Sequence, residues 1–193
     1  MSDRVLSNYI VCMSAGLNTI VDSWDTIVKF ANQIEETTVN GGTVYVAGNG
    51  GSAAISDHLV CDCVKNVSTN STLSPRVVSL VSNVPMLTAI SNDISYEESF
   101  SYYFERLSIN PNDMLIVISS SGNSPNIVKV LESAKKKKIK TAALVGFSGG
   151  KAKDLADVSI HIPIKNYGVC EDLHQSVMHI VSQYLNKKHI NVA

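Results

Sequence analysis

The amino-acid sequence predicts a single α/β domain in which a five-stranded parallel sheet carries helices on both faces. Five short runs of branched apolar residues alternate with segments of helical periodicity, and this alternation is typical of parallel α/β folds. The runs are apolar throughout rather than alternately polar, as expected of strands buried on both faces. A length of 193 residues is enough for one domain with a sizeable core, so we expect residues 1–193 to form one unit.

A long N-terminal helix is expected first, over residues 4–37. Apolar residues recur there at spacings of three and four between Val5 and Ile34, and Asn40-Gly41-Gly42 ends the pattern. This helix precedes the first strand and so belongs to no strand–helix unit of the sheet. Its apolar stripe must pack somewhere, and we expect a subunit interface.

The remaining elements follow in alternation. Strands are predicted at residues 43–47, 76–81, 113–118, 141–146 and 158–162. Helices are predicted at residues 52–66, 84–92, 96–108, 124–137, 151–156 and 170–187. In such sheets, ligands bind beyond the carboxyl ends of the strands.

Two polar loops lie at such strand ends. Residues 48–52, Gly-Asn-Gly-Gly-Ser, run from the first strand into a helix, and residues 119–124, Ser-Ser-Ser-Gly-Asn-Ser, follow the third strand. Glycine permits close approach of a ligand, and a helix N-terminus favours an anion such as phosphate. Ala53 breaks the Gly-x-Gly-x-x-Gly dinucleotide pattern. Either loop alone could be an ordinary capped turn, but two together favour one phosphorylated small molecule.

A second group of polar residues lies on two predicted helices. His58 and Asp62 are four apart, and Glu171, Gln175 and His179 follow at successive four-residue steps, so each set shares a helix face. Two imidazoles and two carboxylates could hold a divalent metal, for which Zn²⁺ is suited. They could equally form a metal-free acid–base pair, or a surface ion pair beside solvent-facing residues. The spacing leaves all three possibilities open.

Composition excludes several classes of function. The formal net charge is −1 and no basic stripe is present, which argues against a nucleic-acid partner. The run of four lysines at 135–138 falls at a predicted helix end, where the helix dipole favours cations. The four cysteines match no zinc or disulfide framework, and neither a signal peptide nor a membrane span is visible. We therefore expect a cytoplasmic protein without a membrane partner.

Taken together, these motifs resemble those of the sugar isomerase (SIS) domain family, and within it the phosphoheptose isomerases. The resemblance covers nearly the whole chain and rests on residues 48–54, Asn92-Asp93, residues 119–124 and the last helix with His179. It implies an aldose–ketose isomerase that converts sedoheptulose 7-phosphate to glycero-manno-heptose 7-phosphate through an enediol(ate). It also implies a homotetramer with sites near subunit boundaries.

Residue roles follow from the same resemblance. It assigns substrate binding to Asn49, Gly50, Gly51, Ser52, Asp93, Ser119, Ser120, Ser121 and Ser124. Among these, the serines would bind phosphate, and Asn49 and Asp93 would contact the sugar. It assigns acid–base catalysis to Asp62 together with His179, and Glu171, a carboxylate where the family has an amide, is the alternative base. It assigns one zinc ion to His58, Asp62, Glu171 and His179.

Two positions depart from the family pattern. Asp62 stands where the family has Glu, and Glu171 stands where it has Gln. The two changes could compensate, with Glu171 as the base, or they could mark another sugar phosphate of surface-polysaccharide synthesis. A third possibility is a non-catalytic SIS-domain protein, similar to the partner of the bacterial replication initiator. A pure binding module has no need of two histidines and two carboxylates at these spacings, which favours the enzyme.

Overall fold

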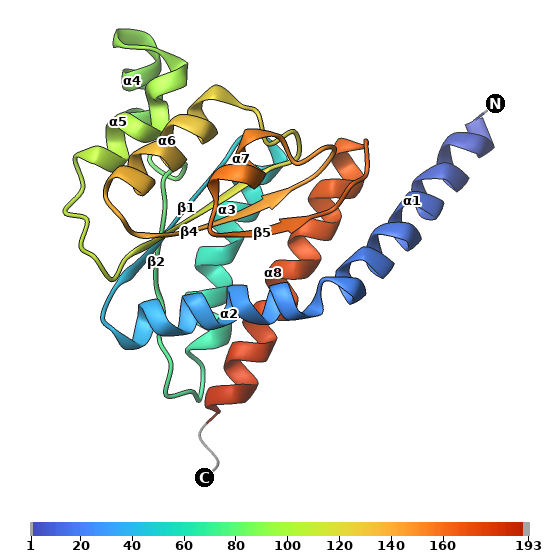
Figure 1. Cartoon of the computed structure of the whole chain (residues 1–193), viewed down its shortest axis with the longest axis horizontal. Helices are drawn as coiled ribbons and strands as arrows, with labels where there is room; N and C mark the ends of the chain where they lie inside the picture. The colour runs from blue at the N-terminus through green and yellow to red at the C-terminus, as the bar shows by residue number, and fades with distance from the viewer. Residues whose placement is uncertain (1, 191–193) are drawn as a thin grey trace.

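Five parallel strands form the centre of the computed structural model, which describes residues 2–190 (Figure 1). The strands lie in the order β2-β1-β3-β4-β5. Their bounds are β1 Thr43–Gly48, β2 Arg76–Ser79, β3 Met114–Ser119, β4 Lys140–Val145 and β5 Val158–His161. All five strands predicted from the sequence are confirmed, as is their parallel pairing.

Helices cover both faces of this sheet. Their bounds are α1 Ser2–Asp22, α2 Trp24–Val39, α3 Gly51–Cys61, α4 Val84–Asp93, α5 Ser99–Glu105, α6 Pro125–Lys136, α7 Gly150–Leu155 and α8 Tyr167–His189. Two further turns are a π-helix, η1 Asp62–Val67, and a 3₁₀-helix, η2 Tyr96–Glu98. Within residues 2–190, no helix is both long enough and apolar enough to cross a membrane.

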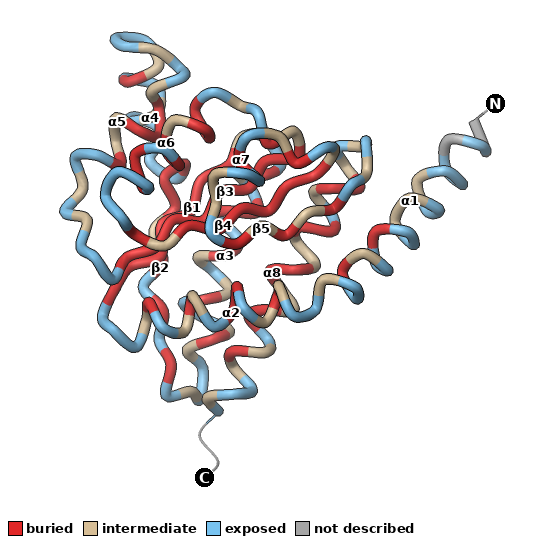
Figure 2. Tube along the Cα trace, in the orientation of Figure 1, coloured by how far each residue is buried: buried red, intermediate tan, exposed pale blue. Residues whose placement is uncertain are grey.

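The apolar strands separate two cores, one on each face of the sheet. Every residue of β1 and β3 is buried, as the continuous red of the central strands shows in Figure 2. One core packs α2, α3 and α8 against the sheet, and the other packs α5, α6 and α7. This explains why the strands are apolar throughout, since each alternate side chain meets a helix on one face or the other.

The N-terminal segment differs from the prediction of one helix over residues 4–37. The structure has two helices, α1 and α2, which meet at Ser23. Helix α2 buries Ile27, Phe30 and Ile34 against the domain, whereas α1 passes the first turns of α8 and then extends away from the body (Figure 1). Because the chain changes direction at Ser23, α2 can pack against the sheet while α1 points away from it. Spacing alone did not reveal it, because both helices carry the same apolar period.

Helix α1 touches the rest of the chain along α8. Gly16 lies so close to Leu173 that a Cβ there would be 2.1 Å from the leucine Cδ1 atom, and the Tyr9 hydroxyl donates to the Asp172 carboxylate. This contact raises the pKa of Tyr9 to about 12, because the carboxylate accepts the phenol proton and disfavours a phenolate. Ile20 joins the core, and Cys12 and Met13 pack partly against it, whereas five large apolar residues of α1 are exposed: Leu6, Ile10, Val11, Leu17 and Val21.

The predicted helix at 52–66 is also divided. It begins as α3 and widens to the π-helix η1 at Asp62. Short π-helical turns are frequent at functional sites because they redirect side chains that a regular helix would place elsewhere. Here the change starts at a residue of the candidate site.

Candidate active site at the carboxyl ends of the strands

The two predicted polar loops lie side by side and line one pocket of about 270 Å³. They come together because β1 and β3 are neighbours in the sheet and both loops follow the carboxyl ends of these strands. The lining residues are Asn49, Gly50, Ser52, Ile118, Ser119, Ser120, Ser121, Ser124, Tyr167 and Glu171. All but three of them were predicted as substrate-binding residues; Ile118 and Tyr167 were not predicted, and Glu171 had another predicted role.

The pocket is built to receive an anion. The N-termini of helices α3 and α6 both face the pocket: their N-cap residues, Gly50 and Ser124, are among the lining residues. Gly50 has a φ of 57°, a left-handed conformation that glycine adopts without strain. The buried hydroxyl of Ser120 has no hydrogen-bond partner among the described residues, which is the state expected of a donor reserved for a ligand. Two helix N-termini and several serine hydroxyls that can donate are the chemistry of a phosphate site.

Glu171 lies at this pocket, beside the start of α3. A Cβ at Gly51 would be 2.3 Å from the Glu171 Oε2 atom, so a larger residue at position 51 would displace the carboxylate from its place against the backbone. Burial raises the pKa of Glu171, and the nearby charge of Asp172 adds to the effect.

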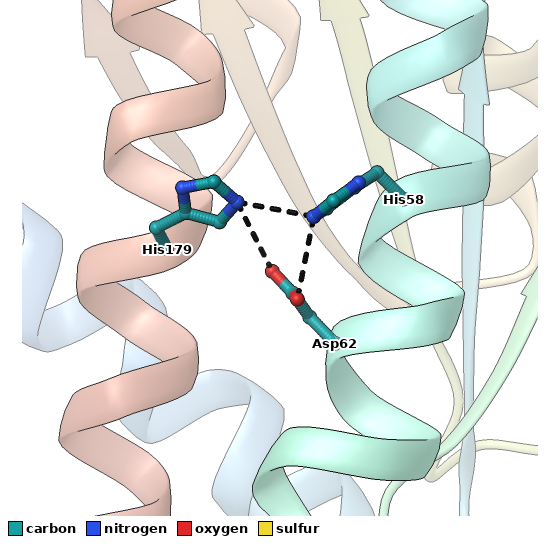
Figure 3. Close-up of side chains that lie close together, drawn as sticks. All are labelled: His58, Asp62 and His179. Carbon is teal, nitrogen blue, oxygen red and sulfur yellow. Dashed lines mark hydrogen bonds and ion pairs between the residues drawn. The ribbon is translucent and has the colours of Figure 1, made fainter.

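A separate cluster contains His58, Asp62 and His179, as Figure 3 shows. His58 Nε2 lies 3.4 Å from Asp62 Oδ1, and His179 Nε2 lies 3.7 Å from Asp62 Oδ2. The two histidine Nε2 atoms are 3.1 Å apart. His58 comes from the last turn of α3, Asp62 from the start of η1 and His179 from the middle of α8. One chain therefore supplies all three side chains.

Of the four predicted metal ligands, the structure brings together three and leaves Glu171 apart. Glu171 and His179 are eight residues apart on α8, which corresponds to a rise of about 12 Å. The shared helix face was predicted, but the rise along the helix axis separates its two ends. Gln175, halfway between them, has its Nε2 atom 2.9 Å from His179 Nε2.

The three clustered residues fit a divalent metal. Their ligand atoms all lie within 4.8 Å of one another, and two imidazole nitrogens with one carboxylate oxygen suit zinc, with a fourth position open for water or substrate. In addition, Asp62 Oδ2 is buried and accepts no hydrogen bond from the described residues. A bound cation would satisfy this oxygen.

Three other residues differ from the sequence-based expectation. Asp93, predicted to contact the sugar, is exposed at the end of α4, where it accepts a 2.8 Å bond from Asn92, and it does not line the pocket. Conversely, Tyr96 and Asn126 were not predicted, yet both hydrogen-bond to Asn49. No motif marks either residue. They are found only because η2 and α6 fold against the first loop.

The chain is similar to known proteins in both sequence and fold. The family model of the SIS domain matches residues 8–146. The phosphoheptose isomerase of Helicobacter pylori strain 26695 is 36% identical over 152 residues, covering 79% of this chain and 78% of the relative. The probable phosphoheptose isomerase of Thermoplasma volcanium is 36% identical over 181 residues, covering 94% and 90%.

Similarity extends to solved structures. A phosphoheptose isomerase from Francisella tularensis superposes with a TM-score of 0.86 at 26% identity, covering 97% of this chain and 98% of that chain. The family model alone spans more than half of the sequence. The chain therefore belongs to the SIS domain family, and within it to the phosphoheptose isomerase-like proteins.

Proposed function

We propose that this protein is an aldose–ketose isomerase that interconverts sedoheptulose 7-phosphate and glycero-manno-heptose 7-phosphate. The observation that carries the proposal is the separation of two chemically different sites on the same helices. The phosphate-type pocket lies at the start of α3, and the His58–Asp62–His179 cluster lies at its end. Along the axis of α8, Glu171 beside the pocket and His179 in the cluster are eight residues, or about 12 Å, apart.

This separation suits a long substrate. In a seven-carbon ketose 7-phosphate, the carbonyl at C2 and the reacting carbon C1 lie at the end of the chain opposite the phosphate. When the loop of residues 119–124 binds the phosphate, C1 and C2 at the other end of the substrate therefore lie near the His58–Asp62–His179 cluster. Binding energy from this remote, unreactive group can fix the reacting carbons in place.

The proposed chemistry is proton transfer through an enediol(ate). The Asp62 carboxylate removes the proton from C1, and reprotonation at C2 gives the aldose. His179, beside Asp62, moves protons between the two substrate oxygens. A zinc ion held by His58, Asp62 and His179 would stabilise negative charge on those oxygens. A carboxylate has two oxygens, so Asp62 can bind a metal ion through one oxygen and accept the proton on the other.

The direct test is conversion of a panel of ketose phosphates by the purified protein. We expect sedoheptulose 7-phosphate to give a heptose 7-phosphate, a precursor suited to surface polysaccharides such as lipopolysaccharide or capsule. Turnover of a different ketose phosphate alone would change the assigned substrate. Tight binding without turnover of any of them would favour the binding-protein alternative.

We place the protein in the cytoplasm, because its four cysteines are free thiols, as expected in a reducing compartment.

Loss of either loop hydroxyl should weaken phosphate binding. We expect Ser121→Ala and Ser124→Ala each to cost about 1–3 kcal/mol, the scale of a hydrogen bond to a charged group. Titration calorimetry with inorganic phosphate and with sedoheptulose 7-phosphate measures this. Ser148→Ala is the control, because Ser148 is exposed and lines a different pocket. Unchanged affinity in both loop variants would disprove the two-loop phosphate site.

We propose that the protein assembles as a homotetramer through α1. Exposed apolar residues along this helix, including Ile10 and Val21, form a surface that a monomer would leave in water. Light scattering should give about four times the chain mass of 20.8 kDa. The double variant Ile10→Asp/Val21→Asp should give smaller species, whereas Val39→Asp, also exposed but at the end of α2, should not. A monomeric wild-type protein at micromolar concentration would refute the proposal.

A further inference from the structure

The side-chain amide of Asn49 is held from behind by two residues outside the main pocket. Its Nδ2 atom donates to Asn126 Oδ1 at 2.9 Å, and Asn126 Nδ2 donates back to Asn49 Oδ1 at 3.0 Å. The Tyr96 hydroxyl donates to the same Asn49 oxygen at 2.8 Å. Asn49 itself lines the pocket between the two loops, whereas Tyr96 and Asn126 do not.

These bonds use most of the hydrogen-bonding capacity of the amide. A primary amide has two N–H donors and an oxygen that accepts two bonds. Asn126 and Tyr96 together fill the oxygen, and Asn126 takes one N–H. A single N–H of Asn49 therefore remains for a ligand. In this state Asn49 can donate to a substrate oxygen, and its own oxygen is not free to accept from a substrate hydroxyl.

The direction of the amide depends on Tyr96. A reciprocal pair of amides keeps both of its bonds if the two groups are turned over together, so Asn126 alone does not select one orientation. Asn126 is 1% exposed and also donates to Ser99 Oγ at 3.3 Å, a hydroxyl that can accept or donate. Tyr96 breaks the symmetry, because a phenol is a stronger donor than acceptor and places the Asn49 oxygen toward itself.

We propose that Tyr96 is a positioning residue that makes Asn49 a dedicated hydrogen-bond donor to an oxygen of the bound sugar phosphate. Tyr96 acts through Asn49, since it lies outside the main pocket and lines a neighbouring cavity of about 170 Å³ with Asp57 and Phe100. Asn49 and Gly50 line both cavities and stand between Tyr96 and the main pocket. The inference rests on the proposed function, because it takes the ligand of the main pocket to be a sugar phosphate. It adds a specificity element that belongs to η2 rather than to either phosphate loop.

The test is a double-mutant cycle with Tyr96→Phe and Asn49→Ala. Tyr96 is 53% exposed, so loss of one oxygen leaves the packing of its ring intact. We expect Tyr96→Phe to lower kcat/KM for sedoheptulose 7-phosphate between about twofold and about tenfold, the range of one net hydrogen bond. In the Asn49→Ala background, the same change should have no effect, because the group through which Tyr96 acts is gone.

A matched control is Tyr102→Phe, since Tyr102 lies on α5 and stacks on Arg106 rather than on the loop; it should leave kcat/KM unchanged. Equal losses from Tyr96→Phe in both backgrounds, or no loss in either, would overturn the inference. Thermal unfolding of each variant checks that it is folded. The cycle is also measured as sedoheptulose 7-phosphate binding by calorimetry, so coupled binding without turnover would refute the proposed function but support this inference.

Discussion

Asp62→Asn is expected to lower solvent proton exchange into the substrate by between about 10² and 10⁴, the range of general acid–base catalysis. The side chain keeps its shape but can no longer accept a proton. Asp62 is the carboxylate that the structure places beside both His58 and His179, at the end of the site where C1 and C2 would lie. Binding of sedoheptulose 7-phosphate should be largely retained, because the phosphate loops are distant from the change.

Glu171→Gln is the matched control, and it restores the residue that the family has at this position. Glu171 lines the phosphate pocket beside Gly51, about 12 Å along α8 from His179. We therefore expect this variant to keep proton exchange and to bind phosphate more tightly, since it removes a negative charge beside an anion site. Loss of exchange in Glu171→Gln with retention in Asp62→Asn would make Glu171 the base. Activity in both variants would refute the acid–base assignment altogether.

His58→Ala is expected to abolish binding of a divalent metal, for which we propose zinc at one ion per subunit. Removal of one nitrogen leaves only Asp62 and His179 of the clustered ligand set, which is too few for a tetrahedral site. Elemental analysis of protein purified without chelator measures the metal content directly, independently of activity.

His161→Ala is the control for the metal experiment. Its ring lies outside the cluster, with Nε2 3.0 Å from the Phe147 carbonyl oxygen, so the variant should keep its metal. Wild-type protein that contains no divalent metal, and whose activity is insensitive to chelators, would contradict the proposed zinc site.

The sequence was sufficient to predict the sheet, because short apolar runs that alternate with helical segments are typical of strands buried on both faces. The sequence was less informative about helix breaks, because the same spacing of apolar residues fits one continuous helix and two consecutive helices. The break at Ser23 and the change to a π-helix at Asp62 leave no mark in the spacing of apolar residues from which the helices were predicted.

The candidate site shows the same division. The loop residues were predictable because glycine and serine between a strand and a helix indicate an anion-binding turn without reference to the rest of the chain. The separation of Glu171 from His179 does not follow from a shared helix face, because such a face extends along the helix axis and eight residues rise about 12 Å. Tyr96 and Asn126 carry no local signal. Their role depends on contacts with Asn49 across 47 and 77 residues of sequence.

The most direct test of the account is deuterium incorporation from D₂O, followed by mass spectrometry and NMR of the recovered sugars. With sedoheptulose 7-phosphate and the wild-type protein, we predict deuterium at C2 of the aldose product and at C1 of the recovered ketose. Both labels should disappear in Asp62→Asn. Isomerisation without solvent deuterium in either sugar would contradict proton transfer through an enediol(ate), and absence of both isomerisation and label would contradict the assignment as a sedoheptulose 7-phosphate isomerase.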